Sequence, residues 1–181
     1  MLIQNVVKKA SEILGLTFDP TDAKNAETAA LIGCADTVYG EIVSDYFPLL
    51  FEEEILFDGD GRGETENFTK RLLYIVSLKS GEKTVKYTVF PDAIHAENVR
   101  NTVLTVRYAY IPDKIEELTA ETELNTGVSE RCFALGIASE YCLLNGMFNE
   151  SVLYDKRFKD SLQAASRKRG EIKIKRRNWV G

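Results

Sequence analysis

The chain has 181 residues, of which 44% are hydrophobic and 28% charged, and its formal net charge is −5. This composition is typical of a globular protein, and one domain is the default for this length. No apolar run approaches the length of a membrane-spanning helix, and the first lysines follow the apolar start of the sequence, so we expect neither a membrane span nor a secretory signal.

The first 46 residues predict two helices. Apolar residues between positions 2 and 15 recur at the spacing of an amphipathic helix, and Gly15 is a suitable stop. Thr21 or Asp22 can cap a second helix that runs to about Tyr46. Small residues make one side of this helix suited to close packing: Ala26, Ala29, Ala30, Gly33, Cys34, Thr37 and Gly40.

The middle third of the chain predicts a small antiparallel sheet. A strand follows Pro48, a Gly/Asp-rich loop follows that strand, and a hairpin turns at residues 79–82 before an alternating run over 85–89. Residues 102–110 form a further strand with an apolar face, because every second residue is apolar: Leu104, Val106, Tyr108 and Tyr110.

Two helices are predicted after this sheet. Residues 128–148 carry a wide apolar stripe, so we expect a central, buried helix that Ser129 caps and that breaks at Asn145–Gly146. A last helix over about 149–168 is expected to turn its apolar residues inward: Val152, Leu153, Phe158, Leu162 and Ala165. The predicted fold is α+β, a helical bundle with an inserted small antiparallel β-sheet and an extended C-terminal tail.

We therefore expect one α+β domain over residues 1–168, with the β insertion at about 48–111, and a tail over 169–181. This tail is basic, since residues 167–177 carry seven Lys or Arg and one Glu. That balance of +6 within a total of −5 leaves −11 for the rest of the chain. An acidic body with a basic tail can seek an acidic partner or nucleic acid.

Catalytic and metal-binding patterns are sparse in the sequence. The three cysteines include no CxxC pair, and Cys132 and Cys142 lie in an apolar helical pattern, where thiols usually pack as small hydrophobes. The one histidine, His95, has no nearby partner pattern for general-base chemistry. We predict no catalytic residue, no metal and no cofactor.

The loop that begins at Asp58 is similar to the calcium-binding loop of an EF-hand but lacks two of its ligand residues. An EF-hand needs an oxygen ligand at its fifth position and Glu at its twelfth, whereas Arg62 and Thr69 stand at those positions. The glycines and aspartates also suit a simple loop tip. An enzyme that uses Asp58, Asp60 and Glu64 stays open as an alternative, and it requires a concave pocket with convergent polar groups.

Residues 105–167 combine a strand, a linker and two helices in a recognisable order. The end of the strand carries Tyr108, four residues before Pro112, and an acidic linker over 116–123 follows. The next two helices carry regularly spaced residues at Glu130, Ala134, Leu135, Glu140, Tyr141, Tyr154, Phe158, Leu162 and Ala165. In this pattern the segment resembles the head-to-tail connector (adaptor) proteins of tailed bacteriophages. The sheet region over 48–110 is longer than that of compact connectors, which leaves the subfamily open.

This resemblance implies a virion protein, made in the host cytoplasm, that forms a ring under the portal, usually of twelve copies. Portal protein, a tail or second neck protein and other copies of the chain would be its partners, and genomic DNA would pass through the ring without specific binding. The tail would dock on the portal through residues that are mostly basic, with a few apolar ones: Arg169, Ile172, Lys173, Ile174, Lys175, Arg176, Arg177 and Trp179. Arg and Trp often anchor interfaces.

Other classes of function compete with this interpretation. A solvated chain end is the ordinary fate of such a tail. Another phage structural or scaffold protein would have similar composition, and a nucleic-acid-binding protein could use the basic tail for salt-sensitive contacts with phosphate. The acidic body and the absence of a recognisable binding motif argue against nucleic-acid binding.

Overall fold

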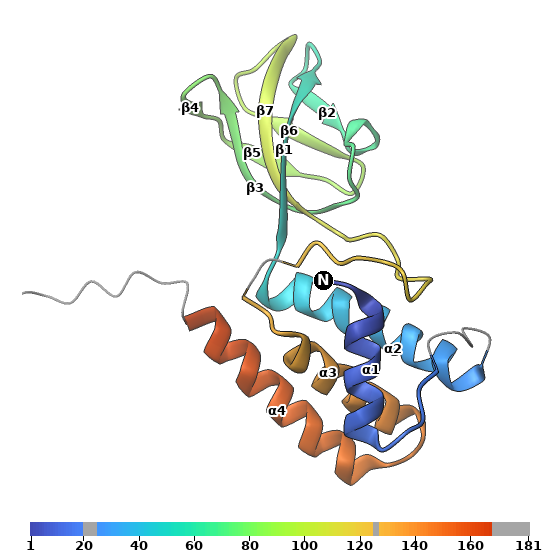
Figure 1. Cartoon of the computed structure of the whole chain (residues 1–181). Coiled ribbons are helices and arrows are strands. Elements are labelled where there is room, and N and C mark those ends of the chain that lie inside the picture. The colour runs from blue at the N-terminus through green and yellow to red at the C-terminus, as the bar shows by residue number, and fades with distance from the viewer. Residues whose placement is uncertain (20–24, 125–126, 168–181) are drawn as a thin grey trace, which may run out of the picture. The chain divides into compact units, whose positions relative to one another are not determined.

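The computed structural model describes residues 1–19, 25–124 and 127–167. The chain divides into two compact units: residues 1–38 with 115–181, here called the helical unit, and residues 39–114, here called the β unit. Both are drawn in Figure 1. Within the described residues, no helix is both long and apolar enough to cross a bilayer.

The prediction of a bundle with one small inserted sheet is wrong in its β part. The described β unit contains seven strands in two antiparallel sheets, with orders β1-β7-β3-β4 and β2-β6-β5. The chain is still a mixture of helices and strands. Segments that we interpreted as a loop and as the second arm of a hairpin supply the extra sheet, because β2 and β5 each pair with β6. The predicted extended tail lies outside the described residues.

The first two helices agree with the sequence. Helix α1, Ile3–Leu14, buries its apolar stripe, and Gly15 ends it at a φ of 70°, a left-handed conformation that glycine adopts without strain. Helix α2, Ala26–Glu41, continues into one π-helical turn, Ile42–Tyr46. The predicted caps Thr21 and Asp22 lie outside the described residues.

Helix α1 receives its N-terminal support from the connection that follows the β unit. No side chain caps α1. Instead, the Ile3 amide donates to the Ala120 carbonyl and the Gln4 amide to the Leu118 carbonyl, each at 3.0 Å. These bonds satisfy amides that a helix start leaves without partners. The connection itself is held to α2, because the Ile115 amide donates to Asp36 at 2.8 Å.

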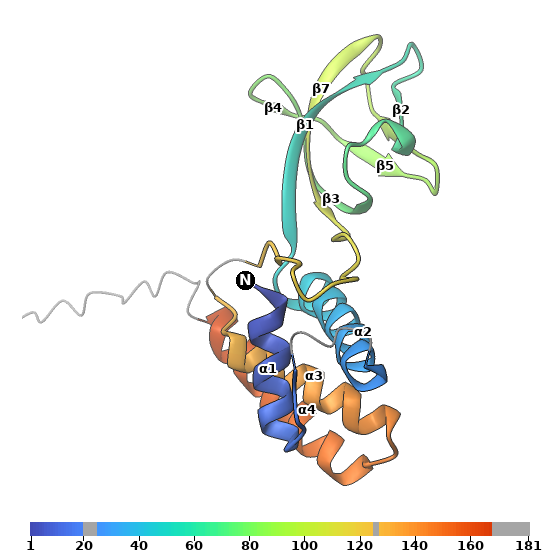
Figure 2. The same ribbon diagram turned by 45° about the vertical axis from the view of Figure 1, so that its right-hand side comes forward.

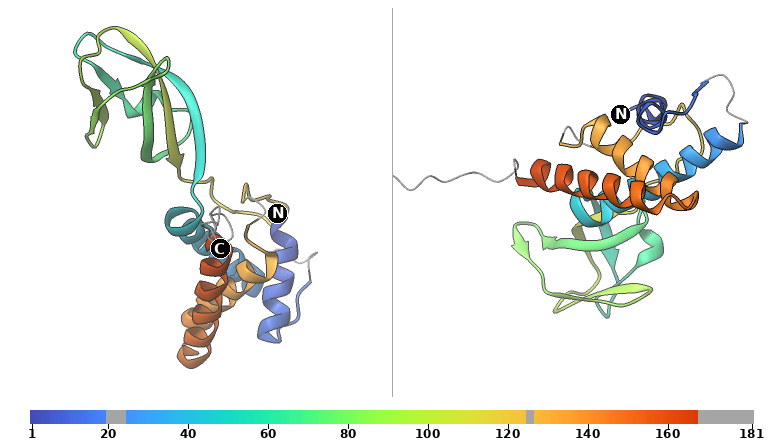
Figure 3. Two further views of the ribbon diagram at one scale, coloured as in Figure 1. Left: turned by 90° about the vertical axis from the view of Figure 1, so that its left-hand side faces the viewer. Right: turned by 90° about the horizontal axis from the view of Figure 1, so that it is seen from below.

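Helices α3, Glu130–Leu144, and α4, Phe148–Arg167, form a hairpin. Ser129 caps α3 as predicted, since the Cys132 amide donates to its hydroxyl at 3.1 Å. Ten of the fifteen residues of α3 are buried, which confirms that it is the central helix. It lies alongside both α1 and α4 (Figure 3). The turn between α3 and α4 includes Gly146 at a φ of 73°.

The larger sheet of the β unit is built around β7, Thr102–Tyr110. It pairs with β1, Leu49–Phe57, and with β3, Leu72–Ser80. The short strand β4, Lys83–Thr84, pairs with the end of β3 at the edge of the sheet. The long strands β1 and β7 run side by side (Figure 2). All four residues of the predicted apolar face of β7 are buried, so that prediction is confirmed.

The smaller sheet consists of β2, Arg62–Glu64, β6, Ala93–Ala96, and β5, Tyr87–Val89. Its contact with the larger sheet is close at one glycine, because a Cβ on Gly63 would lie 2.8 Å from the ring of Phe57. Phe57 and Ile94 are completely buried. The core of the β unit therefore lies between the two sheets.

The three cysteines are free and buried, as the sequence predicted for Cys132 and Cys142. Burial raises the pKa of Cys34 and of Cys132 to about 11. A thiol with so high a pKa is almost entirely protonated at neutral pH, so these residues are packing groups rather than nucleophiles.

Gly136→Ala is expected to lower the free energy of unfolding by about 1–3 kcal/mol, as overpacking does. The added Cβ would lie 2.6 Å from Val38 and 3.0 Å from the ring of Phe158. Gly33→Ala is the matched control, because nothing lies within 4 Å of a Cβ at that position in α2. It should be neutral or stabilising by up to about 1 kcal/mol. Chemical denaturation measures both, and equal effects would contradict the packing described for α3.

Candidate functional site

The predicted docking tail lies outside the described residues, from Arg169 to Trp179. The body of the protein offers other candidates among the residues that the structure describes. These are the acidic turn at Asp58, a polar concavity in the β unit, and exposed apolar surface on each unit.

The carboxylate of Asp58 organises its own turn. It accepts hydrogen bonds from the amides of Arg62 at 2.8 Å and of Asp60 at 2.9 Å. The bond from the Arg62 amide is the main cause that lowers the pKa of Asp58. The Arg62 side chain pairs with Glu64 at 2.9 Å and with Asp92 at 2.7 Å. No group of three His, Cys, Asp or Glu residues in the described ranges could hold a metal ion.

Gly61 fixes where this turn meets the neighbouring loop. Its φ is +77°, and a Cβ there would lie 2.5 Å from the carbonyl oxygen of Ala96 and 2.9 Å from that of Val99. The Ala96 amide donates to the Gly61 carbonyl at 2.7 Å, and the Asn101 amide donates to that of Asp58 at 2.8 Å. The turn and the loop over 97–101 therefore form one rigid end of the β unit.

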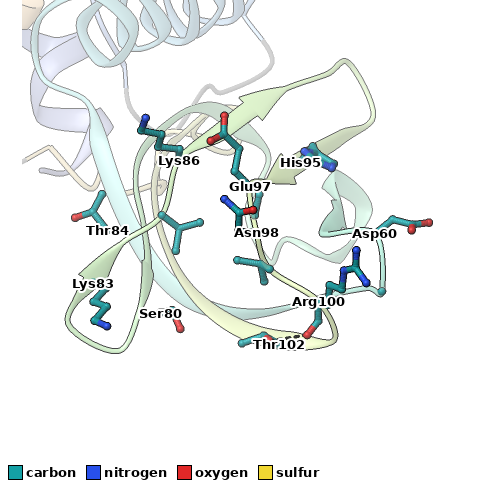
Figure 4. Close-up of a pocket in the computed structure, with 14 residues that line it drawn as sticks. Asp60, Ser80, Lys83, Thr84, Lys86, His95, Glu97, Asn98, Arg100 and Thr102 are labelled. Atoms are coloured by element: carbon teal, nitrogen blue, oxygen red, sulfur yellow. Dashed lines mark hydrogen bonds between the residues drawn. The ribbon is translucent and has the colours of Figure 1, made fainter.

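A polar concavity of about 1040 Å³ opens beside this end of the β unit (Figure 4). Its rim carries three cationic side chains, Lys83, Lys86 and Arg100, and two carboxylates, Asp60 and Glu97. Two asparagines of the adjoining loop, Asn98 and Asn101, have φ values of 57° and 45°, in the left-handed region that asparagine tolerates best after glycine.

The concavity lacks the arrangement that acid–base catalysis needs. Figure 4 shows Lys83, Lys86 and Arg100 set apart around the rim, so that they do not converge on one point. His95 is exposed on the same wall, and no hydrogen bond joins it to Asp60 or Glu97 among the described residues. A general base is normally held and tuned by a bonded neighbour. The sequence-based enzyme alternative gains a pocket here, but no catalytic pair.

A partly buried hydrogen-bond network joins β1, β7 and the segment before β3. The hydroxyl of Tyr108 donates to Glu53 at 2.5 Å and accepts from the Lys70 amide at 3.2 Å. Thr69 donates to the same carboxylate through its amide at 3.0 Å and through its hydroxyl at 2.6 Å. Burial, assisted by the hydrogen bond to Glu53, raises the pKa of Tyr108 far above its usual value. This network is structural, because its groups satisfy one another.

The outer face of the larger sheet exposes apolar side chains. Leu56 of β1 lies directly opposite Val103 of β7, and both are more than half exposed. At the other end of the sheet, Leu50 of β1 and Tyr74 of β3 are exposed, and both pair with Ala109 of β7. Glu52 lies between the two ends, opposite Arg107. This face therefore combines apolar ends with a charged centre.

A second apolar surface lies on the helical unit at the end of α3 and the start of α4. We call residues 143–153 the α3–α4 corner. Six large apolar side chains are exposed there, the largest fractions being 71% for Leu144, 70% for Val152 and 64% for Phe148; the others are Leu143, Met147 and Leu153. The prediction that Val152 and Leu153 turn inward is wrong, although Phe158 and Leu162 are buried as predicted.

The residues that carry the connector resemblance serve packing wherever the structure describes their contacts. Glu130 pairs with Lys9 of α1, and the Tyr141 hydroxyl donates to Glu27 at 3.1 Å. Ala134 and Leu135 are buried in α3, as Phe158 and Leu162 are in α4. These contacts therefore build the helical unit.

Comparison with protein-family models and with curated proteins finds no match to this chain. Function is therefore inferred from the residues themselves. Sequence reasoning did not identify the α3–α4 corner, although one signal was available. The run LLNGMF is apolar on both sides of a helix break, so not all of its side chains can face one core.

Glu53→Gln should change the pH dependence of stability. Burial alone would raise the pKa of Glu53, but the bonds from Thr69 and Tyr108 outweigh it and lower this pKa. A lowered folded-state pKa contributes stability that is present above the unfolded value, about 4.5, and is lost as pH falls through the folded value. The advantage of the native chain over the variant should therefore be largest near neutral pH and shrink in acid.

Urea denaturation between neutral pH and about pH 3 measures this difference. Glu54→Gln is the matched control, because Glu54 lies next to Glu53 on β1 and is exposed. A Glu53→Gln difference that does not vary with pH would contradict the role assigned to the network.

Proposed function

We propose that this chain is a structural subunit of a phage virion that forms a ring between the portal vertex and the tail. Apart from the connector resemblance, the observation that carries the proposal is exposed apolar surface on both compact units. Large apolar patches on a folded surface mark contact sites with other proteins. A protein that joins a portal to a tail needs at least two contact surfaces, and each unit of this chain exposes apolar side chains that could supply one.

The distribution of charge supports the same function. The balance of −11 outside residues 167–177 repels phosphate, so DNA could slide past such a body without being held. In this proposal the basic tail docks on the portal, and charge complementarity assists encounter and register. A tail that becomes ordered only on binding gives weak single sites, and many copies around a ring overcome this by avidity.

Nucleic-acid binding is the second candidate, and the rim of the polar concavity provides a specific observation in its favour. Lys83, Lys86 and Arg100 could contact phosphates along a strand. Asp60 and Glu97 share that rim, however, and reduce its net charge to +1, since three cations face two carboxylates. We therefore rank this function below the connector.

Co-sedimentation with the portal ring encoded by the same genome tests the proposal. The full chain should bind in a ring stoichiometry, whereas a chain that ends at Lys168 should lose binding, because the truncation removes Trp179 and five of the seven Lys and Arg residues of 167–177. A tail in which Lys and Arg are replaced by Gln is the control that separates charge from apolar contact. Absence of portal binding, together with DNA binding that weakens steeply with salt, would overturn the connector function and favour the second candidate.

A further inference from the structure

We propose that the α3–α4 corner binds the α3–α4 corner of a second copy of this chain. The proposed portal-to-tail function requires contact surfaces but does not say which surface joins two copies. This contact does not depend on the portal or the tail. Its evidence lies within the helical unit.

The corner is apolar and almost without charge. Between Arg131 and Lys156 the chain contains no Lys or Arg, and Glu150 is the only ionisable acidic residue between positions 141 and 154. Two identical surfaces of this kind bring together one carboxylate each, that of Glu150, which also lines the hollow beside the corner, and otherwise meet without desolvation of charge. A phosphate-bearing partner would find no cation there, and a basic peptide would find a single carboxylate.

A hollow lies directly beside the exposed side chains. Its volume is about 340 Å³, and it lies between the end of α1 and the start of α4, with Leu14, Leu16, Met147 and Tyr154 in its wall. The hydroxyl of Tyr154 donates to the Ile13 carbonyl at 3.4 Å, which holds that wall in place. Because Met147 lines the hollow and Phe148 is the next residue, each copy presents a protruding ring next to a receiving cavity.

This juxtaposition makes the corner complementary to itself. When Phe148 of one copy enters the hollow of a second copy, the same rotation brings the second Phe148 to the first hollow. A reciprocal contact of this kind is isologous and closes after two copies. It therefore joins copies of the free chain in pairs, whereas neighbours in the proposed ring meet head to tail through other surfaces.

The size of the surface agrees with a pair. Six large side chains exposed at these fractions present on the order of 500 Å² of largely apolar surface, near the upper end for a monomer. A standard interface buries about 800 Å² on each partner. Polar side chains around the corner, such as Asn145, Asn149 and Lys156, are exposed and can supply the remaining rim.

Analytical ultracentrifugation of the full chain tests this inference. We expect a dimer that dissociates on dilution. Phe148→Ser combined with Val152→Ser should weaken the dimer by at least about tenfold, the factor that corresponds to 1.4 kcal/mol. Because both side chains are exposed, the thermal melt of this variant should match that of the native chain. Leu56→Ser combined with Val103→Ser removes similar exposed apolar groups from the β unit and should leave the dimer intact.

Three results would overturn the inference. The first is a full chain that stays monomeric up to about 100 µM, a concentration that would reveal even a weak pair. The second is a dimer that the Phe148 and Val152 substitutions leave unchanged. The third is a dimer lost on truncation at Lys168, because the basic tail would then be the occupant of the corner. Each readout is independent of portal binding, so failure here is distinguishable from failure of the proposed function.

Discussion

The central position of α3 controls the arrangement of the helical unit. Ten of its fifteen residues are buried, so other helices must cover α3 on several sides at once. Helix α4 can approach closely because residue 136 is glycine, which leaves room for Phe158 and for Val38 of α2. Cover from α1 ends at Leu14, where Gly15 turns the chain. The last residues of α3 and the first residues of α4 remain apolar and exposed at that end, and the α3–α4 corner follows directly from this geometry.

Sequence patterns predicted the elements that depend on neighbouring residues in the chain or that have a strong apolar periodicity. The alternation of β7, the Ser129 cap and the glycine at the end of α1 all express short-range physics. The second sheet was missed because β2 and β5 contain only three residues each and depend on β6, a partner that no local pattern identifies. Val152 and Leu153 were misplaced for a related reason. An apolar stripe shows that a helix can be covered, but not where its covering helix ends.

The polar groups and the exposed apolar surfaces of this protein lie in different places. The carboxylate of Asp58, which the sequence offered as a candidate ligand or catalyst, accepts hydrogen bonds from backbone amides and stabilises its own turn. Glu53 accepts hydrogen bonds from Thr69 and Tyr108 and stabilises the strands around it. The polar concavity has charges of both signs that do not converge (Figure 4). Large apolar side chains are exposed on each unit. The exposed apolar surfaces support the proposal that this protein works by assembling with others.

Hydrogen–deuterium exchange of the full chain, alone and with the portal ring, tests this account most directly. It reports which amides a partner protects, region by region. The account predicts new protection in the segment 168–181 when portal is present, with exchange unchanged in the loop over 97–101 beside the concavity. Portal-independent protection of residues 143–153 should appear as the concentration of the chain is raised. Protection confined to the concavity, with no change in the tail or the corner, would contradict the central claim that this protein acts through contact surfaces.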